Sequence, residues 1–159
     1  PTPRPITDAQ WPGLPPGTVD EDLRVDPATR GVRDVVVFLL DDPVNRTGRP
    51  LRTDLPDHTP ATHAVAAGPT QFTPRVLAAR AGDALRVTAT PGVKVVIDGD
   101  ERAEVKPLAV TRSALALTAE PRSWMKGWVW AFDHPYFAVT GADGRFVIRD
   151  VPPGARRLV

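Results

Sequence analysis

The 159-residue chain contains no cysteine, a single methionine and only three histidines. Without cysteine it can form no disulfide, and it can offer neither a thiolate nucleophile nor a thiolate metal ligand. Twenty basic side chains against nineteen acidic ones leave a formal net charge of +1, so no large excess of charge attracts nucleic acid or an anionic membrane. The longest apolar run, residues 35–40, is far shorter than the roughly 20 residues of a membrane-spanning helix.

The sequence also lacks the patterns of common active sites. The acidic clusters at residues 19–22 and 98–101 are typical of solvated turns, whereas a general acid needs a buried, perturbed carboxylate. Ser113 and Ser123 have no nucleophile-elbow context, and the glycines form no phosphate-binding loop. The sequence therefore predicts a protein that is not an enzyme.

Proline is plentiful, with 19 residues, and six of them fall within residues 1–17. Because proline fixes φ and lacks the N–H that helices and ladders require, we expect residues 1–30 to form an extended arm and residues 31–159 to form one domain. The arm carries Trp11, a side chain poorly placed in free solvent. It either folds back over the domain, docks on a partner or stays disordered.

Short runs of β-branched and apolar residues, separated by turn signals, predict strands along the rest of the chain. These runs lie within residues 32–42, 75–90, 93–101, 106–120, 123–132 and 136–159. Gly82-Asp83 and Asp143-Gly144 are expected to form the turns of two hairpins. Residues 43–69 read as a long loop with one short strand near 62–67, and a strand is favoured over a helix in 106–120. With no convincing amphipathic helix, the fold class is predicted to be an all-β sandwich or Greek-key barrel.

The stretch SWMKGWVWAFDHPYF, residues 123–137, holds three of the four tryptophans. Alternation along a strand would place Trp124, Trp128 and Trp130 on one side, with Met125, Val129 and Ala131 packed inside. Three exposed indole rings would form a conspicuous apolar patch, which either the arm or another protein must cover. We therefore predict a partner-binding surface made of Trp11, Trp124, Trp128 and Trp130.

The histidines are the only candidates for a metal site derived from the residues alone. His58 and His63 lie five residues apart with Asp54 and Asp57 nearby, a spacing that suits zinc or copper but is also common in solvated loops. His134 precedes a proline, and its ring is expected to brace a turn by hydrogen bonding a backbone carbonyl.

From Gly31 onward the chain carries VRDVVVFL, FTPRVLAARAGDALRV and WMKGWVWAFDHPYFAVTGADGRFVIRDVPPGARRL. On these blocks it resembles the cupredoxin-like domain of exported bacterial proteins labelled plastocyanin-like or methylamine-utilisation-protein-like. In that family the last block typically runs from Cys-x-x-His-Pro-Trp-Met through Asp-His-Pro-Tyr-Phe to a Pro-Pro-Gly turn. The resemblance implies a cupredoxin-like Greek-key β-sandwich and an exported, periplasmic or cell-surface location.

The copper ligands implied by the resemblance are missing here. Ala119 stands at the cysteine position, Arg122 at the histidine after it, and Val95 near the other histidine, so only Met125 remains. Alanine, arginine and valine offer no lone pair suited to copper at neutral pH. The resemblance therefore implies a metal-free domain with no cofactor.

Three functions follow as hypotheses. The first is a non-catalytic accessory subunit docking on a larger membrane-associated complex; the resemblance suggests a respiratory or photosynthetic electron-transfer complex with its cytochrome as host. The second is a metal-binding or redox protein using His58, His63 and Met125, which titration with Cu(II) and Zn(II) would test. The third is a carbohydrate-binding sandwich in which Trp128 and Trp130 stack on sugar rings, which a glycan panel would test.

Overall fold

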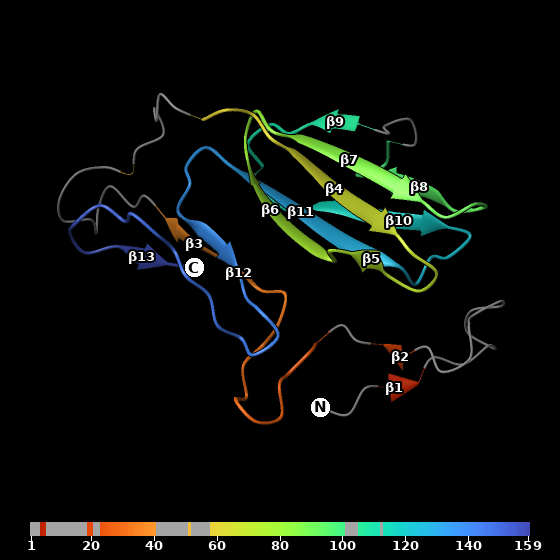
Figure 1. Ribbon diagram of the computed structural model, residues 1–159, viewed down its shortest axis with the longest axis horizontal. Coiled ribbons are helices and arrows are strands. Elements are labelled where there is room, and N and C mark those ends of the chain that lie inside the picture. Colours follow the sequence, from red (N-terminus) through yellow and green to blue (C-terminus); the bar gives the residue numbers. More distant parts are fainter. Residues whose placement is uncertain are drawn as a thin grey trace.

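The computed structural model describes residues 4–5, 19–20, 23–40, 51, 58–100, 105–111 and 113–159, and in these residues every regular element is a β-strand. The fold is therefore all-β, as the turn-punctuated strand pattern predicts. Figure 1 shows two larger sheets facing each other, with a smaller sheet beside them and a short ladder near the N-terminus.

The first larger sheet has the order β6-β11-β10-β8. Its strands are β6 (Val76–Arg80), β11 (Lys126–Phe132), β10 (Leu115–Glu120) and β8 (Lys94–Ile97). β10 is antiparallel to both of its neighbours, whereas β6 and β11 run parallel. The parallel pair joins segments about fifty residues apart in sequence, with Val76 opposite Trp128.

The second larger sheet has the order β5-β4-β7-β9. Its strands are β5 (Phe72–Thr73), β4 (Thr62–Ala67), β7 (Ala84–Ala89) and β9 (Val105–Pro107). The strand expected near residues 62–67 is thus confirmed, and it runs parallel to β7. Residues 41–50 and 52–57, most of the predicted long loop, lie outside the described residues.

One apolar core lies between these two sheets and makes them a sandwich. It joins Val65 and Leu85 of the second sheet to Ile97, Leu117 and Val129 of the first, all with at most 1% of their surface exposed. Alternating burial along β11 is confirmed, because Gly127, Val129 and Ala131 are buried while Trp128 and Trp130 are only half-buried.

A third sheet, in the order β12-β3-β13, lies against the end of the sandwich (Figure 1). Its strands are β12 (Phe137–Val139), β3 (Val36–Leu40) and β13 (Arg157–Leu158). Phe38 of β3 brings its ring to 6.1 Å from that of Trp130 and 4.9 Å from that of Phe132. The outer face of β11 is therefore covered in part by the chain itself.

The hairpin predicted at Gly82-Asp83 is wrong, because the turn leads from β6 in one sheet to β7 in the other and the two strands do not pair. The second predicted hairpin, at Asp143-Gly144, is only partly correct. The turn forms, since Gly141 donates its N–H to the carbonyl oxygen of Arg145 and Gly144 has a φ of 79°. Residues 145–150, however, form no strand, because β12 pairs with β3, a strand from a hundred residues earlier. Local residue preferences thus formed the turn, but β12 pairs with β3, which is distant in sequence, instead of with residues 145–150.

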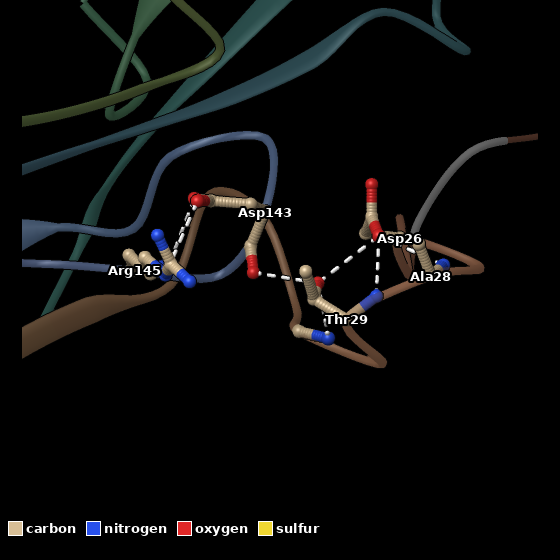
Figure 2. A network of polar contacts seen from close by, with 6 residues as sticks. Asp26, Ala28, Thr29, Asp143 and Arg145 are labelled. Atoms are coloured by element: carbon tan, nitrogen blue, oxygen red, sulfur yellow. Dashed lines mark hydrogen bonds and ion pairs between the residues drawn. The ribbon is translucent and has the colours of Figure 1, made fainter.

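Part of the predicted arm is described. β1 (Arg4–Pro5) and β2 (Val19–Asp20) form an antiparallel ladder. Residues 23–30 attach to the domain: Arg24 donates to the Oε1 of Gln71 at 2.6 Å, and the Thr29 hydroxyl donates to the carbonyl oxygen of Asp143 at 2.8 Å. Figure 2 shows Thr29 bridging Asp26 and Asp143. Trp11 lies outside the described residues.

Two glycines allow this attachment. A Cβ built on Gly31 would lie 2.0 Å from the carbonyl oxygen of Asp143, and one built on Gly144 would lie 2.4 Å from the Cα of Gly31. Real Cβ atoms do not approach backbone atoms so closely. The two backbone segments therefore touch only because neither Gly31 nor Gly144 has a side chain. This contact and the Thr29 bonds hold residues 23–34 beside the 140–145 turn.

Candidate functional site

A cleft of about 320 Å³ opens beside β6 and β11 and is lined in part by residues from the segment 24–36. Among the described residues, its polar lining consists of Arg24, Arg33, Arg75 and Asp34. Two indoles, Trp128 and Trp130, form an aromatic wall, and Val36, Val76 and Ala114 complete the lining. The cleft thus combines positive charge with apolar and aromatic surface.

β11 positions the first indole. Because Val129 points into the core with none of its surface exposed, Trp128 must face outward. Its backbone N–H donates to the carbonyl oxygen of Arg75 at 2.9 Å. The Arg75 guanidinium carbon lies 5.0 Å from the centre of a Trp128 ring, within the range of a cation–π interaction.

The second indole is held by other rings. Trp130 stacks on Phe132 with 6.0 Å between ring centroids and 8° between planes, and Phe38 packs on it at a tilt of 32°. The row continues through Phe132 to His134 and Phe137 at 5.5 and 4.9 Å. Trp130 therefore anchors the third sheet to the sandwich as well as lining the cleft.

Trp124 is not on this face, so the prediction that it shares a side with Trp128 and Trp130 is wrong. It packs against the main core cluster that includes Met125. The reason is local: the Met125 N–H donates to the carbonyl oxygen of Arg122 at 2.9 Å, closing a turn before β11 begins at Lys126. Strand alternation therefore does not extend back to residue 124.

His58 and His63 meet at a third residue, Asp83. The Nε2 of His63 lies 2.7 Å from one carboxylate oxygen of Asp83, and the Nε2 of His58 lies 2.8 Å from the other. The His63 contact is a hydrogen bond, whereas the His58 contact is close in distance without hydrogen-bond geometry. Asp54 and Asp57, the acidic neighbours considered from sequence, lie outside the described residues.

The Asp83 carboxylate also anchors backbone. It accepts the N–H of Ala61 at 2.9 Å and that of Arg80 at 3.0 Å, and the residue is 2% exposed. Asp83 thereby ties the segment before β4 to the turn between β6 and β7. Among the described residues, no group of three or more histidine, aspartate or glutamate side chains is arranged to hold a metal ion. The sequence marked Asp83 as a turn residue, but nothing in it indicated burial.

These contacts determine the pKa of Asp83. Burial alone would raise it, yet the hydrogen bonds from Ala61, His63 and Arg80 together with the charge of His58 outweigh burial and lower the pKa from 3.8 to about 2. The folded protein therefore strongly favours the ionised carboxylate.

This shift predicts acid sensitivity. Because the folded pKa lies below the unfolded one, the stabilisation is fully present above pH 3.8 and is lost as the pH falls toward 2. We expect the free energy of unfolding to drop by about 2 kcal/mol from this group between pH 5 and pH 2. Urea denaturation at several pH values would show this drop, and the Asp83→Asn variant should lack it. An equal drop in both proteins would contradict the assignment.

His134 braces its turn through backbone hydrogen bonds, of which those to Leu39 and to its own backbone favour the charged ring. Its Nδ1 accepts the backbone N–H of Tyr136 at 3.2 Å, and the residue is 7% exposed. Burial lowers the pKa of His134, against the opposing charge of Asp133. The ring is a buried part of the aromatic row.

The positions matched to the family's copper ligands lie together. Val95 and Ala119 are opposite each other on β8 and β10, and Met125 is buried in the same cluster. Arg122 turns its guanidinium to the carbonyl oxygen of Gly68 at 3.0 Å. This set offers one thioether and no imidazole or thiolate, so it does not fit a mononuclear copper centre.

No family model matches the chain, and no curated protein matches it either. The described part of the chain contains no helix that could cross a membrane. The site must therefore be interpreted from its own geometry.

Proposed function

We propose that this chain is a non-catalytic binding module, an accessory subunit that docks on a larger exported or membrane-bound complex. The observation that carries the proposal is the cleft, in which Trp128 and Trp130 stand beside three arginines. Tryptophan and arginine are the residues most enriched where protein–protein interfaces concentrate their binding energy. The described lining residues include no histidine, serine or other nucleophile, and this composition suits adhesion better than chemistry.

The cupredoxin resemblance supports a domain that has kept its scaffold and lost its metal. Val95 lies on a different strand from Ala119, yet these two and Met125 converge in one apolar cluster at the positions the resemblance assigns to ligands. A domain that cannot hold copper cannot carry electrons through it, and its retained surface is then the part available for function. The host in this proposal is an electron-transfer complex, respiratory or photosynthetic, in the periplasm or at the cell surface.

Affinity capture from native membranes, read by quantitative mass spectrometry, tests the proposal. We expect the wild-type chain to enrich one complex, and the Trp128→Ala variant to lose at least 90% of that enrichment, since truncating a hot-spot aromatic costs on the order of 2 kcal/mol or more. Phe146→Ala is the matched control, because Phe146 is an exposed aromatic side chain that does not line the cleft. Equal enrichment by both variants would reject the cleft as the docking surface.

Thermal unfolding of both variants accompanies the capture. Trp128 is half-buried, so its replacement must leave a cooperative transition for the comparison to count. If Trp128→Ala does not fold, the Arg75→Gln variant, which removes the guanidinium stacked on the same ring, takes its place.

A further inference from the structure

The cleft lining indicates the chemistry of its occupant. Three arginines and one aspartate line it among the described residues, and one of the arginines, Arg24, already donates to Gln71. Arg33 Nε lies 3.5 Å from the Oδ1 of Asp34, a distance of loose ion pairing, and the Arg33 side chain remains 46% exposed. Arginine's planar fork suits carboxylates in particular, which it binds through two parallel hydrogen bonds. An occupant with a negative charge complements this lining.

The indoles are poorly placed to stack on a sugar. Trp130 already packs its ring against Phe132 and Phe38, and Trp128 lies under the Arg75 guanidinium. A sugar also needs hydrogen-bonding partners for several hydroxyl groups. Apart from the arginines and Asp34, the described lining consists of Val36, Val76, Ala114 and the two indoles, with no amide or hydroxyl side chain. The lining favours an apolar group beside the negative charge.

We propose that the cleft binds a peptide segment of a partner protein in which an acidic side chain stands next to an apolar one. The carboxylate lies against Arg33, whose side chain is exposed, and the apolar side chain packs on Val36, Val76 and Ala114. A volume of about 320 Å³ accommodates one or two side chains rather than a whole folded surface. The inference rests on the docking role proposed above and specifies what docks.

Fluorescence anisotropy with synthetic octapeptides tests this chemistry. The panel compares a Glu-Phe-Glu core with a Gln-Phe-Gln core, which lacks charge, and a Glu-Gly-Glu core, which lacks the apolar side chain. We expect the Glu-Phe-Glu peptide to bind at least tenfold more tightly than either of the others, and more weakly at 200 mM than at 50 mM salt, because exposed charges are screened. Comparable binding of the Gln-Phe-Gln peptide, or no binding of any peptide, would overturn the proposal.

Charge reversal on the protein gives the matching test. Arg33→Glu is expected to weaken binding of the Glu-Phe-Glu peptide at least tenfold, whereas Arg86→Glu, on an exposed position of β7, should leave it unchanged. Equal weakening by both variants would mean nonspecific attraction. An oligogalacturonate that binds more tightly than the peptide would assign the cleft to acidic glycans instead.

The capture experiment and the peptide panel fail separately. If Trp128→Ala loses the captured complex while no peptide binds, docking through the cleft stands and the peptide chemistry is wrong. If capture is the same with and without Trp128, the docking function itself fails whatever the peptides do.

Discussion

Replacing Asp83 with alanine is expected to lower the free energy of unfolding by about 3 to 5 kcal/mol. The change removes one carboxylate that serves four partners, the backbone N–H groups of Ala61 and Arg80 and the rings of His58 and His63. Because the site is buried, N–H groups left without an acceptor would lose their hydrogen bonds without full compensation by water. Urea denaturation at pH 7 measures the loss.

The matched control is Glu120→Ala, which removes a carboxylate from an exposed strand end and should change stability by at most about 0.5 kcal/mol. Asp83→Asn should fall between the two, because an amide oxygen can still accept from backbone while the negative charge opposite the histidines is gone. A loss below about 1 kcal/mol in Asp83→Ala would show that the carboxylate does not hold this junction together.

The Gly31→Ala variant is expected to be less stable by about 2 to 3 kcal/mol. The added methyl group would lie 2.0 Å from the carbonyl oxygen of Asp143, and the neighbouring atoms are backbone that cannot rotate away. Residues 23–34 must then separate from the 140–145 turn. Thermal unfolding, with amide exchange of the Val35 N–H that donates to the Thr140 hydroxyl, reports both the stability and the place where the structure opens.

Gly141→Ala serves as the control, because a Cβ there meets its nearest neighbour at 3.4 Å, an ordinary contact. Gly31 is also more informative than Gly144, whose φ of 79° disfavours alanine for a conformational reason as well. If Gly31→Ala and Gly141→Ala prove equally stable, the close approach of the backbone at Gly31 to the backbone at Asp143 is not a feature of the folded protein.

Local patterns were enough to predict most strands. Short apolar runs between turn signals indicated β3, β6, β7 and β8, and the alternation of leucine and alanine indicated β10. Alternation along residues 126–132 correctly separated Val129 and Ala131 from Trp128 and Trp130. The alternation failed at Trp124, where a turn precedes the strand, and the strand expected after Gly144 did not form. Both errors come from extending a strand pattern past the point where its ladder partner ends.

The candidate site was predicted only in part. Trp128 and Trp130 were singled out as surface aromatics, but the arginines beside them were not, because Arg24, Arg33 and Arg75 reach the cleft from segments far from β11 in sequence. His58 and His63 were considered together as a conceivable metal pair, but Asp83, the residue that both of them contact, was missed. Spacing along a chain reveals neighbours on one strand, not those that a parallel ladder brings together.

The sequence by itself determined the all-β class, the turn at Gly82-Asp83 and the absence of thiolate chemistry, since these depend on residue type and short-range backbone preference. Only the tertiary structure decided which strands pair in parallel, that Asp83 is buried between two histidines, and that arginines gather beside the indoles. The physical reason is that burial and charge proximity arise from contacts between distant segments, and the packing of the whole sandwich selects those contacts.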